Sequence, residues 1–213
     1  MPQIQAVTTY LALNACNDTS PSGVTDRTTG QTIYLPDLDL GVYFDVTNRE
    51  ALLNQYATNG NLYAGRYRRV LVDSGATAAN VKTGTIGLMP SLAAIQVDGG
   101  GVSLPTENIV TSYDQALGTG LRPVVFLNAI TPGNYGFVQE LGIATVLGKA
   151  SLTATATIGD VIIFGASGLV DDPTQSTSLT YALWKQILGQ AIDLPKANGL
   201  FRVQLQNWPV VQE

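Results

Sequence analysis

The segments VVFLNAI (Val124–Ile130), YGFVQELGIATVL (Tyr135–Leu147), SLTATATI (Ser151–Ile158) and DVIIFG (Asp160–Gly165) follow one another in the middle of the chain. They are rich in strand-forming residues, and Gly, Pro and Asn separate them, as in strands joined by turns. Residues 123–159 hold only two charges, Glu140 and Lys149. In SLTATATI, threonines alternate with alanines at the two-residue period of a strand. Such a series predicts a compact β-barrel or β-sandwich.

The same pattern extends in both directions. Upstream, four further segments read as short strands: YRRVLVDSGAT (Tyr67–Thr77), TGTIGLMP (Thr83–Pro90), AAIQVD (Ala93–Asp98) and NIVTSY (Asn108–Tyr113). Downstream, SLTYALWKQILGQAI (178–192) fits either a helix or a strand. The dipeptide Asn198-Gly199 is a hairpin signal, and it predicts pairing of Gln190–Asp193 with Leu200–Gln206.

Residues 1–62 lack one clear period and read as an N-terminal arm. Two short elements are expected at Ile33–Leu35 and Val42–Val46. A helix is predicted at about 48–58, because Glu50 follows Thr47 by three residues, as in a capping box, and Gly60 lies beyond the end. The predicted organisation is therefore an arm with a short helix (1–62) and a β-barrel or β-sandwich domain (63–213).

The composition points to a protein that works through its surfaces. Only 13% of the 213 residues are charged and 45% are hydrophobic, whereas an ordinary soluble domain is about 25% charged. Either an assembly buries much of the surface, or uncharged polar residues coat it. The net charge of −5 argues against binding nucleic acid. The basic group Arg66, Arg68 and Arg69 is too short to reverse this, and indicates a solvated or protein-facing strand start.

Several enzymatic and metal-binding classes are excluded by the residues available. The chain has no His and one cysteine, Cys16, so His-dependent hydrolysis, His-ligated metals and an intramolecular disulfide are ruled out. Asp171 and Asp172 lie near Asp160 in sequence but lack the spacing of a calcium loop, which favours a solvated turn. We expect no catalytic residues, no cofactor and no metal.

The segment VLVDSGAT (Val70–Thr77) resembles the catalytic loop of aspartic proteases, with Asp73 as the catalytic carboxylate and the glycines of 97–101 as a possible flap. The alternative is an ordinary turn, since Asp accepts local backbone hydrogen bonds and Gly tolerates positive φ.

No signal peptide or membrane span is expected. The first 26 residues carry no Lys or Arg and no continuous apolar core, and no apolar run approaches the roughly 18 residues of a transmembrane helix. We expect a soluble protein made in the cytoplasm.

Four motifs occur in order between about Tyr67 and Leu205: VLVDSGATAANVKTGTIGLMP, LRPVVFLNAITPGNYGFVQELGIATVL, TIGDVIIFGASGLVDD and ILGQAIDLPKANGLFRVQL. Within them, NYGFVQELG places an aromatic residue and Gly before two apolar residues and Gln139, with a second Gly after. Taken together, over about two-thirds of the chain, they resemble the decoration, or cement, proteins of tailed bacteriophage capsids.

That resemblance implies a compact β domain, often trimeric, at three-fold and quasi-three-fold positions on the outer capsid surface of the virion, bound to the major capsid protein. The longer N-terminal region departs from the smallest family members. Because aromatic side chains dominate interface cores, six residues are candidate interface anchors: Tyr63, Tyr67, Tyr135, Phe137, Trp184 and Trp208. Ordinary core packing is the alternative for each. The alternative functions are a tail, fibre or baseplate component and a dimeric aspartic protease using Asp73.

Overall fold

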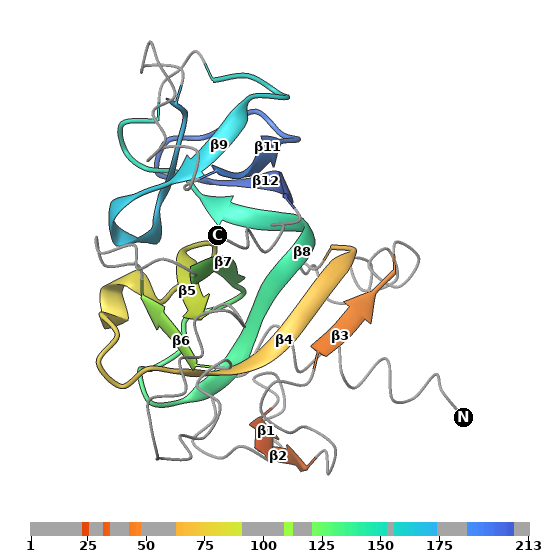
Figure 1. Cartoon of the computed structure of the whole chain (residues 1–213), viewed down its shortest axis with the longest axis vertical. Helices are drawn as coiled ribbons and strands as arrows, with labels where there is room; N and C mark the ends of the chain where they lie inside the picture. The colour runs from red at the N-terminus through yellow and green to blue at the C-terminus, as the bar shows by residue number, and fades with distance from the viewer. Residues whose placement is uncertain are drawn as a thin grey trace, which may run out of the picture.

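The computed structural model describes residues 23–25, 32–34, 43–47, 63–90, 109–112, 121–152, 156–173 and 187–206 (Figure 1). These residues are mainly β, as predicted. The strands are β1 (Gly23–Thr25), β2 (Thr32–Tyr34), β3 (Tyr43–Val46), β4 (Gly65–Val72), β5 (Ile86–Pro90), β6 (Ile109–Ser112), β7 (Leu121–Phe126), β8 (Tyr135–Leu147), β9 (Val161–Phe164), β10 (Val170–Asp171), β11 (Ile187–Ala191) and β12 (Leu200–Leu205). The described part of the chain also has 3₁₀ turns at Ala78–Asn80 and Ala166–Gly168. Among the described residues, no helix is long and apolar enough to cross a membrane.

Ten strands form one sheet in the order β10-β9-β11-β12-β8-β7-β5-β6-β4-β3, with an additional pairing between β8 and β4. The strands pair antiparallel except for β4 with β6. The long strand β8 belongs to two parts of the molecule (Figure 1). Its first half pairs with β4 and β7, and its second half pairs with β12. We call β3 to β7 with the first half of β8 the first lobe, and the second half of β8 with β9 to β12 the second lobe.

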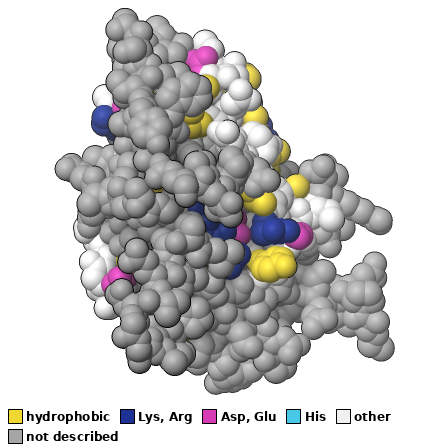
Figure 2. Space-filling view, in the orientation of Figure 1, with side chains coloured by type: hydrophobic (Ala, Val, Ile, Leu, Met, Phe, Trp, Pro, Cys, Tyr) yellow, Lys and Arg dark blue, Asp and Glu magenta, His cyan; other side chains and the backbone are white. Residues whose placement is uncertain are grey.

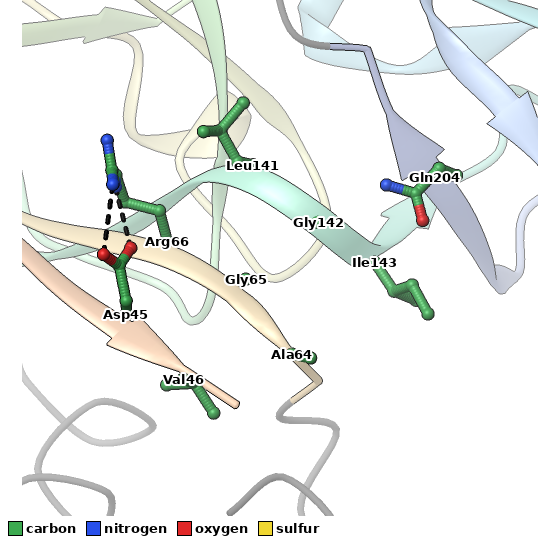
Figure 3. A pocket seen from close by; sticks show the side chains of 9 residues that line it. All are labelled: Asp45, Val46, Ala64, Gly65, Arg66, Leu141, Gly142, Ile143 and Gln204. Atoms are coloured by element: carbon green, nitrogen blue, oxygen red, sulfur yellow. Dashed lines mark hydrogen bonds and ion pairs between the residues drawn. The ribbon is translucent and has the colours of Figure 1, made fainter. Parts of the chain in front are cut away.

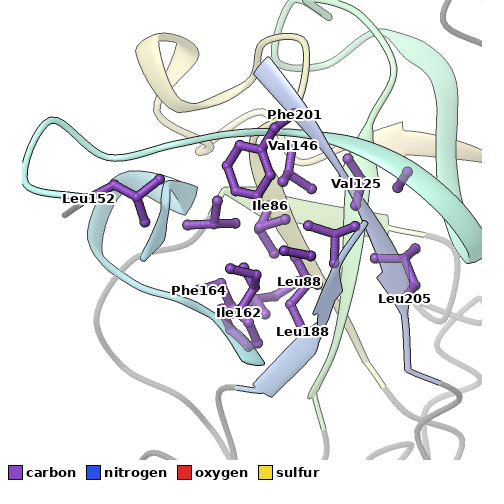
Figure 4. Packing of buried hydrophobic residues seen from close by; sticks show 14 residues of the cluster. Ile86, Leu88, Val125, Val146, Leu152, Ile162, Phe164, Leu188, Phe201 and Leu205 are labelled. Carbon is purple, nitrogen blue, oxygen red and sulfur yellow. The ribbon is translucent and has the colours of Figure 1, made fainter. Parts of the chain in front are cut away.

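Each lobe has an apolar core, and the two cores share β5 and β7. The core of the first lobe contains Val70, Val72, Ala76, Val81, Met89, Val124, Phe126, Ile130 and Val138. The core of the second lobe (Figure 4) contains Ile86, Leu88, Val125, Ala144, Val146, Leu152, Ile162, Phe164, Val170, Leu188, Ala191, Phe201, Val203 and Leu205. Since successive residues of a strand face opposite sides, β5 and β7 are buried on both faces. This layered packing is compatible with a β-sandwich-like domain.

A glycine at the middle of β8 divides the lobes. Gly142 has φ +92°, and a Cβ there would clash with the carbonyl oxygen of Ala64. Gly65, its partner on β4, is equally crowded by the carbonyl oxygen of Leu141. The buried Gln139 amide donates hydrogen bonds to Leu141 O (3.1 Å) and Ile143 O (2.7 Å) on either side of Gly142. The Gln and second Gly of the NYGFVQELG motif therefore build and satisfy this bend.

Most of the predicted strands are confirmed. Gln190 pairs with Gln204 and Ala191 with Val203, which confirms the closing hairpin. Its connection, 192–199, is longer than a two-residue turn, and Asn198 lies at its end with φ 52°. SLTATATI is not a strand where it is described: Ser151 and Ile158 lie in turns. AAIQVD and residues 178–186 lie outside the described residues.

The predicted arm contributes a strand to the sheet. Within 1–62, β1 and β2 form a separate hairpin, while β3 pairs with β4 through Tyr43–Arg68 and Asp45–Arg66. The short elements expected at 33–35 and 42–46 are thus present. The helix predicted at about 48–58 lies outside the described residues. The division at residue 62 stays a prediction.

Candidate docking surface

The predicted interface residues fall into three groups. Tyr67 and Phe137 are fully buried, which corrects their assignment as surface anchors: the core-packing alternative holds for both. The Tyr67 hydroxyl donates to Tyr63 O (2.5 Å) and accepts from Tyr63 N (3.2 Å), so it fixes the chain entering β4. Tyr63 and Tyr135 are half-buried. Trp184 and Trp208 lie outside the described residues.

The basic group of β4 is divided between the two faces of the sheet. Arg69 is fully buried, and its guanidinium lies 5.5 Å from the Phe137 ring centre and 5.8 Å from that of Tyr135. Arg66 and Arg68 belong to the opposite face, where Arg66 pairs with Asp45, and Arg68 and Arg122 of β7 flank Glu140. The strand start that the sequence indicates as solvated or protein-facing is thus a cluster of guanidinium groups held by two carboxylates.

We call the cluster formed by Tyr43, Asp45, Arg66, Arg68, Arg122 and Glu140 the arginine–tyrosine patch. Figure 2 shows basic, acidic and apolar side chains side by side where β3 and β4 reach the surface. The patch lies at the margin of the sheet, because β3 is the last strand in its order.

Glu140 holds two of the arginines in place. Its side chain is only 6% exposed, and its Oε1 lies 2.5 Å from Arg68 Nε and 2.8 Å from Arg122 Nη2. The close Arg68 Nε contact lacks hydrogen-bond geometry, and Arg68 Nη2 donates to Oε2 at 3.4 Å instead. A shielded carboxylate between two guanidiniums leaves this group of three with one net positive charge.

Asp45 fixes the third arginine. Arg66 Nε and Nη2 donate to the two carboxylate oxygens of Asp45 at 2.8 and 3.0 Å, which is the bidentate geometry of a strong ion pair. These hydrogen bonds lower the pKa of Asp45 and raise that of Arg66, so both groups stay charged near neutral pH. The Tyr43 ring lies 4.8 Å from the Arg66 guanidinium and 5.8 Å from that of Arg68, and Tyr43 is 54% exposed. An exposed aromatic ring therefore lies against two cations.

An open cavity of about 510 Å³ adjoins the patch (Figure 3). Its floor is the close crossing of Gly65 and Gly142. Around them lie Asp45, Val46, Ala64, Arg66, Leu141, Ile143 and Gln204. Figure 3 shows Asp45 and Arg66 on one side of the β8 bend and Gln204 of β12 on the other. The cavity thus adjoins the bend of β8, where the two glycines allow β4 and β8 to cross closely.

Asp73, the candidate protease residue, occupies a turn. Its carboxylate accepts the Gly75 N–H at 2.7 Å and its carbonyl accepts the Ala76 N–H at 3.0 Å. The residue is exposed, whereas the protease loop requires a shared, shielded carboxylate pair. The glycines of 97–101 lie outside the described residues.

The acidic residues of the second lobe are used locally. Asp171 pairs with Lys149 at 3.1 Å, and the Asp160 carboxylate accepts the Thr157 N–H at 2.6 Å. In the part of the chain that the structure describes, no group of three or more Cys, Asp and Glu residues is placed to hold a metal ion.

Sequence reasoning missed Tyr43, Arg122 and Glu140. Tyr43 carries no strong signal, because an aromatic residue on a short strand is equally typical of a core. Glu140 does carry a signal in the sequence, because it is one of only two charges in residues 123–159. A lone charge in an apolar strand requires a partner.

Comparison with protein-family models and with curated proteins finds no match. Among solved structures, the chain is similar to the N base of the head fibre gp8.5 of bacteriophage phi29. The identity is 10%, the TM-score is 0.35, and the match covers 66% of this chain and 92% of that one.

Proposed function

We propose that this chain is a structural protein of a bacteriophage virion, and specifically a decoration protein that stabilises a capsid. The observation that carries the proposal is the arginine–tyrosine patch, which sets an exposed tyrosine and three oriented guanidiniums beside an open cavity at the sheet margin. Tyr and Arg are the residues that most often dominate protein–protein binding. The low charge content and the order of motifs resembling capsid decoration proteins support the same function.

In this proposal the protein acts without catalysis. It associates as a trimer at three-fold and quasi-three-fold positions and binds neighbouring major capsid proteins from outside the shell. A symmetric oligomer buries surface in every subunit at once, which fits a chain with only 13% charged residues. The rigid β framework then connects neighbouring capsid proteins mechanically.

Three measurements test this. Size-exclusion chromatography with light scattering should give a trimer, and the purified protein should co-sediment with expanded heads of its own phage from which decoration has been removed. Cryo-electron microscopy should then show density at three-fold positions on the outside of the shell. A monomer that does not bind heads would contradict the proposal.

The same experiments separate the alternatives. Binding to tails but not heads would replace decoration by a tail, fibre or baseplate role. Peptide cleavage by a dimer, lost on Asp73→Asn, would replace it by an aspartic protease. The decoration proposal requires that Asp73→Asn leave assembly and head binding unchanged, because Asp73 belongs only to its local turn.

A further inference from the structure

Building on the proposed function, we infer that the arginine–tyrosine patch and the adjoining cavity form the surface that meets the capsid, and that their partner is an acidic protein segment. The inference names both the contact surface and the chemistry of the surface that it binds. It rests on charge, on the fixed orientation of the guanidiniums and on the shape of the cavity.

The charge of the patch differs in sign from that of the chain. Arg66, Arg68 and Arg122 face Asp45 and Glu140, so the patch carries 3 − 2 = +1, whereas the whole chain carries −5. An acidic partner is attracted at this surface and repelled by the chain as a whole. Such complementarity selects one face for docking and suppresses wrong orientations.

The guanidiniums are oriented before a partner arrives. Asp45 accepts hydrogen bonds from Nε and Nη2 of Arg66, which fixes the plane of the guanidinium beside the Tyr43 ring. Glu140 fixes Arg68 and Arg122 from below, where its own carboxylate is shielded. Because the arginine side chains lose little further freedom on binding, more of the interaction energy appears as affinity.

Tyr43 and the cavity complete the surface. Tyr43 presents an aromatic ring that is 54% exposed and already stacked against Arg66. The cavity has apolar side chains (Val46, Leu141 and Ile143) as well as the Gln204 amide and the Asp45–Arg66 pair. A partner segment with a carboxylate beside an apolar side chain fits this combination.

Two opposed variants test the inference. Arg66→Gln and Asp45→Asn break the same ion pair but change the patch charge in opposite directions, to 0 and +2. We expect Arg66→Gln to weaken binding to decoration-free heads about tenfold and Asp45→Asn to strengthen it about threefold.

Tyr43→Ala should also weaken binding, and Lys196→Gln, which removes an exposed cation in the second lobe, should leave it unchanged. Raising NaCl from about 0.05 M to about 0.5 M should weaken wild-type binding.

Equal weakening by Arg66→Gln and Asp45→Asn would mean that the pair is only structural, and would overturn the inference while the decoration function stands. If wild-type protein binds no heads, the decoration function fails, and a fluorescein-labelled glutamate-rich peptide tests the patch separately. The wild type should bind this peptide more tightly than the Arg66→Gln variant does, and should not bind a lysine-rich peptide of equal length. Arg66-dependent binding of a DNA duplex in place of the acidic peptide would also overturn the inference.

Discussion

The two lobes share β8 yet are built from different kinds of buried residues. Of the six buried polar or charged side chains in the described residues, five belong to the first lobe: Arg69, Thr85, Asn128, Gln139 and Glu140. The sixth, Asp172, belongs to the second lobe. Burying polar groups costs free energy unless each is paired, whereas burying apolar groups stabilises directly.

This difference indicates a division of roles. The apolar second lobe is the part whose packing stabilises the fold most efficiently. The first lobe retains arginines and a shielded glutamate. Buried charges of this kind stabilise a fold less than apolar packing does, but they can give a surface specificity for its partner. Substitutions in the second lobe should therefore reduce stability, and those in the patch should reduce binding.

The largest loss of stability should come from a substitution in the core of the second lobe. Phe164→Ala removes a fully buried ring at the centre of that cluster, and we expect a loss of about 4 kcal/mol in the free energy of unfolding. Tyr43→Ala, an aromatic truncation in the first lobe, should change stability by less than about 0.5 kcal/mol because the ring is exposed. Urea denaturation of both variants measures this contrast. Similar losses would contradict the division of roles.

The second-largest loss in the free energy of unfolding is expected from a substitution at the boundary between the lobes. Gly142→Ala adds a Cβ that clashes with the Ala64 carbonyl oxygen at φ +92°, and we expect a loss of about 3 kcal/mol. Gly159→Ala is a matched control, since its φ is +94° but no atom lies within 4 Å of the added Cβ. It should lose only about 1 kcal/mol, from backbone strain alone. Equal losses would mean that the close crossing of β4 and β8 contributes nothing.

The sequence predicts the strands of the first lobe better than those of the second. YRRVLVDSGAT, TGTIGLMP and NIVTSY contain most of β4 and all of β5 and β6, whereas SLTATATI is not a strand where it is described, and 178–192, which contains β11, fits either a helix or a strand. In the second lobe the Asn198-Gly199 signal does agree with the observed pairing of β11 with β12. The motif NYGFVQELG also acquires a physical meaning, because its Gln139 and Gly142 build the bend.

The arginine–tyrosine patch was not predictable from the sequence in this way. It brings Asp45, Arg66, Arg122 and Glu140 together from four strands, and the pairing of β3 with β4 and of β8 with β4 is not encoded in any local pattern. The anchors Tyr67 and Phe137 were misassigned for a related reason. Residue type favours interfaces and cores equally, and only the fold decides between them.

Glu140 tests whether the first lobe depends on its buried charge. Glu140→Gln keeps the shape but leaves Arg68 and Arg122 facing each other without a counter-charge. We expect a loss of about 2 kcal/mol, less than for a fully enclosed pair because Arg122 is one-third exposed. Adding Arg122→Gln should recover part of the loss, because it removes the repulsion. A double-mutant cycle measures this coupling, and strict additivity would show that the charges act independently.

The smallest expected effect is the loss of stability in acid that comes from two Arg–Asp ion pairs. One pair belongs to the patch, and a similar pair lies in the second lobe. Arg202 donates to Asp193 through Nε (2.7 Å) and Nη2 (2.6 Å), as Arg66 does to Asp45, and Asp193 also accepts the Arg202 backbone N–H at 3.1 Å. In both pairs the hydrogen bonds from arginine lower the carboxyl pKa. The stabilisation is therefore present above the ordinary Asp pKa of about 3.9, and is lost as the pH falls through the lower pKa of the folded state.

Asp193 should account for more of this acid sensitivity than Asp45. Its side chain is 31% exposed against 60% for Asp45, and a more exposed pair is screened more strongly and contributes at most about 1 kcal/mol. Urea unfolding of the wild type, Asp45→Asn and Asp193→Asn at about pH 7 and about pH 3 compares them. Asp193→Asn should remove the larger part of the difference between the two pH values. If Asp45→Asn removed more, the patch pair would be the stabilising one, and its exposed position would no longer indicate a role in binding.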